Sequence, residues 1–119
     1  MIKIFLVEDD DSIREVLEIF LRSEDYTVHS FANVSEFKNR RKDELPDLYL
    51  FDVMLPDGSG IDLCKEIKNN DLNEGIPVII MSAHAQLTQI KDVCNPDDFI
   101  AKPFDIDQLL QQIQKMVRS

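Results

Sequence analysis

Glycine and cysteine are scarce in this sequence, which limits the kinds of site that it can form. The 119 residues contain three glycines and two cysteines. Neither glycine-rich phosphate-binding loop, G-x-x-x-x-G-K or G-x-G-x-x-G, occurs in the chain. The cysteines, Cys64 and Cys94, lie far apart and form no C-x-x-C pair. We therefore expect two half-buried thiols in a reduced, cytoplasmic protein rather than a disulfide.

The sequence also has no long hydrophobic run and too few basic residues to balance its acids. The apolar runs at residues 4–7 and 78–81 have four residues each, whereas a segment that spans a bilayer needs about 20. The first run leads directly into the acidic residues 8–11, so we expect no signal peptide. Thirteen Lys and Arg against 23 Asp and Glu give a formal net charge of −10. Because such a surface repels nucleic-acid phosphates and anionic lipids, we expect neither direct nucleic-acid binding nor a membrane-surface role.

Short apolar runs alternate along the chain with segments in which apolar residues recur every three or four positions. The runs predict strands, and the periodic segments predict helices. The length and the 44% apolar content suit one core, so we expect residues 1–119 to form a single domain. Ser12 and Glu15 are spaced as a capping box for the first helix. The predicted strands cover residues 2–7, 26–31, 48–51, 78–81 and 99–101, and the predicted helices cover residues 12–21, 34–45, 61–67, 87–94 and 106–117.

Three of the predicted strands, at residues 2–7, 48–51 and 78–81, are largely apolar without alternation, which indicates that both of their faces are covered. Parallel strands joined by right-handed helical crossovers explain this pattern. Five strand–helix units are too few to close an eight-stranded barrel. The expected fold class is therefore α/β, an open and doubly wound parallel sheet of five strands with five helices.

Polar side chains follow four of the predicted strands at the points where these strands end. Glu8 and Asp9 follow the first, Asp52 the third, Ser82 the fourth and Lys102 the fifth. Because ligands of open α/β sheets bind beyond the carboxyl ends of the strands, we expect these five side chains to lie on one edge of the sheet. Each of them alone is typical of an ordinary turn or helix entry, and only the joint pattern indicates a site.

The charges of this edge indicate its chemistry. Carboxylates a few ångströms apart raise each other's pKa unless a cation offsets them. Lys102 and a hard divalent cation are the candidates, since carboxylate oxygens suit Mg²⁺ and no His or Cys spacing suits zinc. A carboxylate nucleophile with a metal ion, an ammonium group and a hydroxyl indicates phosphoryl transfer, with an aspartyl phosphate as the product.

The chain also resembles a known family over nearly its whole length, residues 3–117. It is similar to the receiver domain of two-component response regulators, in the single-domain style of the chemotaxis response regulator. The resemblance implies a flavodoxin-like fold with the strand order 2-1-3-4-5. The residues that carry it are 4–10 (IFLVEDD), 52–60 (DVMLPDGSG), 81–83 (MSA) and 102–104 (KPF).

For the acceptor and the metal, the resemblance implies roles for four residues. Asp52 would be the phosphoacceptor. Asp9 and Asp52 would bind Mg²⁺ directly, together with the backbone carbonyl of Met54. Glu8 would act on the metal through a water molecule.

For the switch, the resemblance implies that the Ser82 hydroxyl and the Lys102 ammonium bind the phosphoryl group. The Lys102–Pro103 peptide bond would be cis. Phe99 would turn inward when Ser82 moves. The fourth helix, the fifth strand and the fifth helix would then form the output face, whose two states the phosphoryl group biases.

The resemblance also implies partners. The phosphoryl group would come from a sensor histidine kinase or a histidine phosphotransfer protein, and the signal would pass to a downstream effector protein or a fused output domain. The identity of the kinase, the output and a phosphorylation-dependent homodimer are left open. The protein would not be an enzyme in the usual sense, because it would catalyse only its own phosphorylation and dephosphorylation.

Two departures from the family pattern concern the fourth helix and the flanks of the acceptor. Residues 93–98 (VCNPDD) replace a frequent Gly-Ala pair, and the segment from Ser82 to Lys102 is short, so we expect a truncated or rebuilt fourth helix. Met54 and His84 resemble the two variable positions beside the phosphoryl group. Because Met54 cannot orient a water molecule and we expect His84 to be exposed, we expect a long-lived acyl phosphate.

Three other interpretations were weighed against this one. A phosphatase of the haloacid dehalogenase type needs a second Asp two residues after the nucleophile, where this chain has Met54. A flavin site of the flavodoxin type needs hydroxyls and N–H groups after the first strand, where Glu8, Asp9 and Asp10 would repel a phosphate. A receiver-like module that is never phosphorylated stays open, although the complete set of edge residues argues against it.

Overall fold

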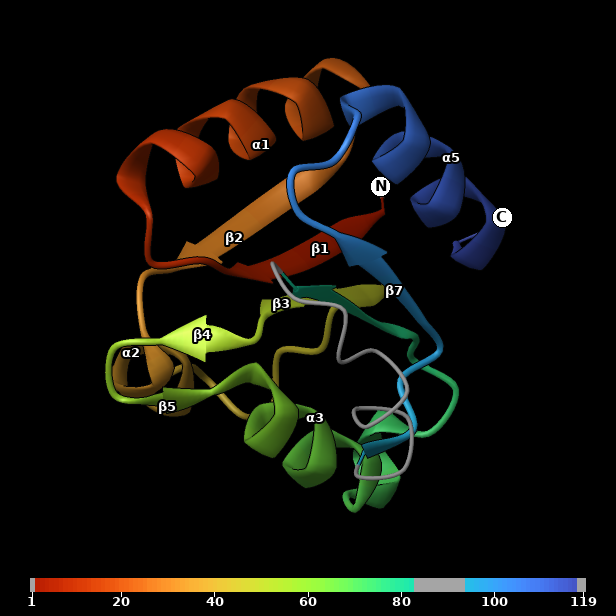
Figure 1. The fold of residues 1–119 in the computed structure, drawn as a ribbon. Coiled ribbons are helices and arrows are strands. Elements are labelled where there is room, and N and C mark those ends of the chain that lie inside the picture. Colours follow the sequence, from red (N-terminus) through yellow and green to blue (C-terminus); the bar gives the residue numbers. More distant parts are fainter. Residues whose placement is uncertain (1, 83–93, 118–119) are drawn as a thin grey trace.

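A five-stranded parallel sheet forms the centre of the molecule (Figure 1). The structure is a computed structural model that describes residues 2–82 and 94–117. The strands are β1 (Lys3–Val7), β2 (Thr27–Phe31), β3 (Leu48–Asp52), β6 (Val78–Ser82) and β7 (Asp98–Ala101). Their order in the sheet is β2-β1-β3-β6-β7, and every neighbouring pair is parallel. This confirms the predicted order 2-1-3-4-5, because β4 (Met54–Leu55) and β5 (Gly58–Ser59) form a separate short hairpin.

Helices cover both faces of the sheet, as a doubly wound fold requires. Those that the structure describes are α1 (Asp11–Ser23), α2 (Val34–Lys38), α3 (Gly60–Lys68) and α5 (Ile106–Met116), with a 3-10 helix, η1 (Asp71–Asn73). Figure 1 shows α1 and α5 on one face, and α2 and α3 on the other. The predicted helix at residues 87–94 lies outside the described residues except for Cys94.

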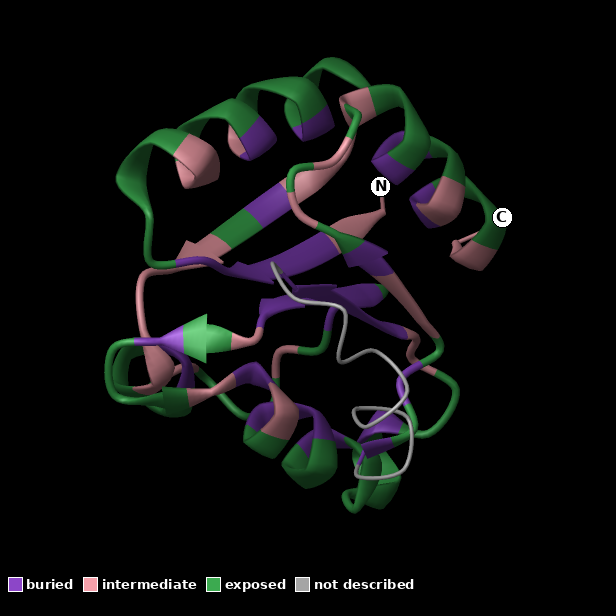
Figure 2. Ribbon diagram, in the orientation of Figure 1, coloured by how far each residue is buried: buried purple, intermediate pink, exposed green. Residues whose placement is uncertain are grey.

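The central strands are buried on both faces, as their continuous apolar sequences predict (Figure 2). Leucine side chains of α1 and α5, such as Leu17 and Leu109, pack on one face. A cluster of aromatic rings fills the other face, and its members include Phe5, Phe37, Tyr49 and Phe51. Each fully buried ring of this kind contributes about 1.5–3 kcal/mol of transfer free energy. A sheet held from both sides keeps the carboxyl ends of its strands in fixed positions.

The start of α1 differs from the predicted one. Its N-cap is Asp10, whose Oδ1 accepts a hydrogen bond from the Ile13 N–H at 3.0 Å. The predicted capping box of Ser12 and Glu15 is therefore wrong. The reason is physical: a carboxylate two residues before Ser12 already reaches a free N–H of the first turn, so the helix begins earlier.

Helix α2 is shorter than the predicted helix at residues 34–45. It ends at Lys38, and Phe37 is its buried residue. The guanidinium of Arg40 then lies 3.8 Å from the centroid of the Phe37 ring, and its Nη1 donates a hydrogen bond to the Phe37 carbonyl at 2.9 Å. This contact covers the ring and the end of the helix, where the prediction placed a further turn.

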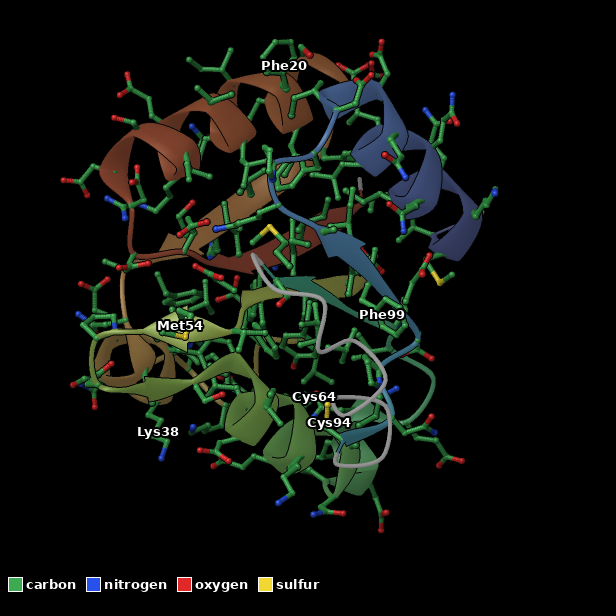
Figure 3. The ribbon with its side chains drawn as sticks, viewed as in Figure 1. Phe20, Lys38, Met54, Cys64, Cys94 and Phe99 are labelled. Atoms are coloured by element: carbon green, nitrogen blue, oxygen red, sulfur yellow. The ribbon has the colours of Figure 1, made fainter. Side chains whose placement is uncertain are left out.

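The two cysteines lie near each other on the α3 side of the sheet (Figure 3). Neither forms a disulfide, and the Sγ of Cys64 donates a hydrogen bond to the Cys94 carbonyl at 3.5 Å. The prediction that they are half-buried is wrong, because Cys64 is 0% and Cys94 6% exposed. Burial raises the pKa of both thiols, so neither is a ready nucleophile.

None of the helices in residues 2–82 and 94–117 combines the length and the apolar content that a membrane span needs.

Candidate functional site

The carboxyl ends of four strands meet at one edge of the sheet, which we call the acidic edge and define as Glu8, Asp9, Asp52, Ser82 and Lys102. The register pairs Val7 with Phe51, Asp52 with Met81, and Ser82 with Ala101. Each edge residue therefore ends its strand or lies within two residues after the end of its strand. The predicted convergence of these five residues agrees with the positions that the sheet gives them.

Lys102 joins two of the acids directly. Its Nζ lies 2.5 Å from Glu8 Oε1 and 3.2 Å from Asp52 Oδ2. Its backbone N–H donates to the Ser82 carbonyl at 2.7 Å, which places the lysine beside the end of β6. The Lys102–Pro103 peptide bond is cis, as the family resemblance implied. Three residues at the ends of three different strands thus share one partly buried contact.

Burial governs the electrostatics of this contact. Glu8 is 0% exposed and Asp52 5%. Burial raises the pKa of Glu8, the hydrogen bond from Lys102 opposes that rise, and nearby Asp52 adds to it. For Lys102, burial alone would lower the pKa, but its hydrogen bond to Glu8 and the charges of Asp52 and Glu8 outweigh burial and raise it. The ammonium therefore stays charged where carboxylates would otherwise repel one another.

The same edge offers oxygen ligands for a metal ion. Glu8, Asp9 and Asp52 can each supply one carboxylate oxygen, and these atoms lie within 4.8 Å of one another. Asp9 is exposed, whereas the other two are buried. Three carboxylates and one ammonium carry a formal charge of −2 when ionised, which a divalent cation balances. All-oxygen donors beside an open, exposed carboxylate fit Mg²⁺, which keeps several water ligands.

The loop after Asp52 is held against that residue by α3. The Gly60 N–H donates to the Val53 carbonyl at 3.1 Å. A Cβ on Gly60 would lie 2.1 Å from the carbonyl oxygen of Asp52, a distance that atoms cannot share. Only glycine allows α3 to begin so close to the end of β3. The sequence suggested turn chemistry here, but it carried no signal for this backbone approach.

The hairpin β4–β5 is also tied to α2. The two carboxylate oxygens of Asp57 accept hydrogen bonds from the Val34 and Ser35 N–H groups at 2.8 and 3.0 Å. Hydrogen bonds from backbone N–H groups, that of Val34 first, lower the pKa of Asp57. Met54 lies on this hairpin with its side chain 65% exposed (Figure 3). Sequence reasoning missed the role of Asp57, because nothing local connects it with residues more than 20 positions earlier.

The predicted switch residues occupy two places. Ser82 is buried at the end of β6. Phe99 lies on β7, an edge strand, and is partly buried against the aromatic side of the core (Figure 3). The Nε2 of Gln112 on α5 donates to the Phe99 carbonyl at 3.1 Å and to Asp98 Oδ2 at 3.0 Å. His84 lies outside the described residues.

An apolar pocket of about 570 Å³ adjoins the acidic edge. Lys102 lines this pocket and is also one of the residues of the acidic edge. Two apolar side chains of α1 near it remain open to solvent, Val16 at 44% and Phe20 at 42%. Figure 3 shows Phe20 on the outer side of α1. The residues that line the pocket are Ser12, Ile13, Val16, Leu17, Lys102, Pro103, Phe104 and Ile106.

The sequence of this chain is similar to known protein sequences over nearly its whole length. The sequence model of the response regulator receiver domain matches residues 4–114. The chain is 30% identical over 118 residues to the phosphate regulon transcriptional regulatory protein PhoB of Rhizobium meliloti, covering 98% of this chain and 52% of that protein. It is 35% identical over 117 residues to the transcriptional regulatory protein CssR of Bacillus subtilis, covering 97% and 51%. The chain thus spans about half the length of these relatives.

Solved structures share the fold. A putative response regulator from Chloroflexus aurantiacus matches with a TM-score of 0.88 at 28% identity, covering 98% of each chain. The response regulator protein TrrA from Thermotoga maritima, solved in complex with Mg²⁺–BeF, matches with a TM-score of 0.86 at 25% identity, covering 98% of this chain and 99% of that one.

Proposed function

Because this chain belongs to the family of response regulator receiver domains, we propose that it accepts a phosphoryl group on Asp52 and passes the signal on through its surface. The donor is the phosphohistidine of a sensor histidine kinase or a histidine phosphotransfer protein. An oxygen of Asp52 forms the new bond to phosphorus while the bond between phosphorus and the imidazole nitrogen breaks. The single observation that carries the proposal is the contact of one partly buried lysine, Lys102, with both Glu8 and Asp52.

The residues of the acidic edge have distinct roles in this reaction. Asp9, Asp52 and the backbone carbonyl of Met54 would hold Mg²⁺, with Glu8 acting through a water molecule. When bound, Mg²⁺ offsets the negative charge that gathers on the phosphoryl oxygens. Lys102 supplies a second positive charge at the same place. Ser82 would donate a hydrogen bond to the phosphoryl group.

The response to phosphorylation would spread through β7. Ser82 and Ala101 are register partners, so a shift of Ser82 acts on the strand that carries Phe99. Gln112 links the Phe99 carbonyl to α5. We place the output face on the fourth helix, β7 and α5, with Phe99 as the aromatic switch. The signal passes to an effector protein or to a fused output domain, and a homodimer through this face is one form that the output can take.

The rival chemistries fit the geometry less well. A phosphatase of the haloacid dehalogenase type needs a carboxylate at position 54, where an exposed methionine stands. A flavin phosphate would meet Glu8 and Asp9 at the end of β1. A receiver turns over no metabolite, so the proposed protein is a signalling module and not an enzyme. Because its two cysteines form no disulfide, it would work in the reducing cytoplasm.

We place the phosphodonor on the apolar pocket beside Lys102. A protein donor must bring its phosphohistidine to the acidic edge, and the pocket, which the exposed Val16 of α1 helps to line, shares Lys102 with that edge. Apolar surface of this kind, rimmed by charged residues, is typical of protein contact sites.

A small acyl-phosphate donor tests the acceptor without any partner. We expect acetyl phosphate with Mg²⁺ to add one phosphoryl group to the wild type in intact-protein mass spectrometry, and EDTA to prevent the addition. Asp52→Asn should abolish the adduct. Asp62→Asn, a matched change of an exposed carboxylate on α3, should leave it unchanged. An unmodified wild type, or equal modification of Asp52→Asn, would contradict the proposal, and the first of these results would favour the module that is never phosphorylated.

A further inference from the structure

The side chain of Arg14 is turned back toward the acidic edge instead of reaching into solvent. Arg14 lies in α1, and its side chain is 19% exposed. Its Nη1 donates to the Glu8 carbonyl at 2.8 Å and to the Asp9 carbonyl at 3.4 Å. Its Nη2 pairs with the Asp11 carboxylate. One guanidinium thus contacts the backbone of the first two acidic residues that follow β1.

These two carbonyls belong to the residues whose side chains face Asp52. The loop has a few other supports: the Glu8 N–H donates to the Phe31 carbonyl at 3.1 Å, and the Asp10 N–H donates to Glu8 Oε2 at 3.2 Å. The Asp10 N–H belongs to the same planar peptide group as the Asp9 carbonyl, so its bond to Glu8 Oε2 restrains one side of that group. Asp9 itself is exposed and supplies one of the three grouped carboxylates. On the other side of this peptide group, the Asp9 carbonyl accepts the hydrogen bond from Arg14 at 3.4 Å.

We propose that Arg14 is a positioning residue for the metal site, which fixes the peptide groups of Glu8 and Asp9 so that their carboxylates meet that of Asp52. The inference rests on the proposed function, because it assigns Mg²⁺ to those carboxylates. Both carbonyls accept from Nη1 while Nη2 pairs with Asp11, so the planar guanidinium ties the loop to the first turn of α1 with a fixed geometry that an ammonium group on a flexible stem does not have. Groups that orient metal ligands from behind are worth roughly 10- to 100-fold in metal affinity.

Charge and position predict opposite effects for the loss of this residue. Arg14 is a cation near an acidic site, so by Coulomb's law its removal should tighten the binding of a divalent cation. If its main effect is to orient the loop, its removal should weaken that binding. The sign of the change therefore distinguishes the two roles, and a role in folding alone predicts no change in the affinity of the folded protein.

Isothermal titration calorimetry with Mg²⁺ alone measures whether the loss of Arg14 raises or lowers the affinity for the metal ion. We expect Arg14→Ala to bind Mg²⁺ about tenfold more weakly than the wild type. Arg14→Lys keeps the positive charge but loses the planar guanidinium, so this variant should also bind Mg²⁺ more weakly. A purely electrostatic role predicts an unchanged Mg²⁺ affinity for Arg14→Lys. The matched control is Arg22→Ala on the same helix. Arg22 likewise pairs with an acid, Glu18, and donates to a backbone carbonyl, that of Val28, but it contacts no residue of the acidic edge. Its removal should leave the affinity within about twofold, as expected for a distant and screened charge.

The outcomes separate this inference from the function on which it rests. A wild type without measurable Mg²⁺ binding would overturn the proposed function. A wild type that binds, with Arg14→Ala and Arg14→Lys binding equally well or more tightly, would overturn the role of Arg14 alone. Thermal melts of each variant without metal show whether it is folded. If Arg14→Ala does not fold, Arg14→Lys decides the matter, and an unchanged affinity of that variant would refute the inference.

Discussion

Lys102 Nζ and Glu8 Oε1 lie 2.5 Å apart although 94 residues separate them in the sequence. The contact joins the ends of β1 and β7, which are not neighbours in the sheet, because the strands between them end at the same edge. A fully buried carboxylate and a lysine that is 15% exposed in its side chain form this pair. The same ion pair therefore affects both the stability of the protein and the chemistry of the acidic edge.

Removal of the lysine should destabilise the protein in a manner that depends on pH. We expect Lys102→Met to lower the free energy of unfolding by about 3 kcal/mol at pH 7, because Glu8 and Asp52 would remain buried without a counter-ion. Burial already raises the pKa of Glu8. The folded variant therefore binds this proton more tightly than the unfolded chain does, and a fall in pH through the raised pKa stabilises it. The loss should thus be smaller at pH 5 than at pH 7 in urea unfolding.

The matched control for that measurement is Lys3→Met. Lys3 pairs with Glu44 at 2.9 Å, but both side chains are about one-third exposed, so the loss should stay below about 1 kcal/mol.

The pKa of Lys102 is raised in the folded protein, so the contribution of its ammonium group to stability persists up to the unfolded pKa of about 10.4 and is lost above it. Equal losses for Lys102→Met at both pH values would contradict the assigned electrostatics.

A methyl group on Gly60 should disturb the acceptor residue. The added Cβ would lie 2.1 Å from the Asp52 carbonyl oxygen, so β3 and α3 must move apart. We expect Gly60→Ala to cost about 2–3 kcal/mol of stability and to slow the phosphorylation of Asp52 by acetyl phosphate. Gly75→Ala is the control, since Gly75 has a φ of +84° and open space around it. It should cost about 1 kcal/mol through its backbone alone and leave phosphorylation unchanged. Equal phosphorylation rates in both variants would show that the close approach at Gly60 does not matter for the reaction.

The side chain at position 54 should set the lifetime of the acyl phosphate. Met54 is 65% exposed on the hairpin that follows Asp52, and its thioether is a poor partner for an attacking water. We expect Met54→Asn to release inorganic phosphate roughly two- to tenfold faster, the worth of one hydrogen bond in the transition state. Met54→Leu should behave as the wild type. A release time course that is the same for all three proteins would refute this expectation.

The surface of α1 should matter for protein donors and not for small ones. We expect Val16→Asp to slow phosphoryl transfer from a histidine phosphotransfer protein that phosphorylates the wild type by roughly tenfold, the effect of losing one contact in an interface. Its reaction with acetyl phosphate should be unaffected. Leu72→Asp changes a side chain that is 66% exposed on η1 and should affect neither rate. Normal transfer to Val16→Asp would place the donor on another surface.

Local patterns in the sequence determined much of this protein. The continuous apolar runs predicted buried parallel strands, and the residues at the ends of those runs predicted which side chains would meet. The side chains of Glu8, Asp9, Asp52 and Lys102 lie close together because parallel strands place all of their carboxyl ends at one edge, whatever the loops between them do. The same patterns could not supply the limits of the helices. Asp10 competed with Ser12 for the cap of α1, and the contact of Arg40 with Phe37 closed α2 early.

Only the tertiary structure decided the contacts that cross between elements. Asp57 reaches the start of α2, Gly60 touches the backbone of Asp52, and Arg14 holds the carbonyls of Glu8 and Asp9. Nothing in the neighbouring sequence marks these residues, because their partners are brought to them by the packing of the sheet and its helices. Spacing along a chain records local geometry, whereas the direction of a long side chain depends on which atoms the fold places within its reach.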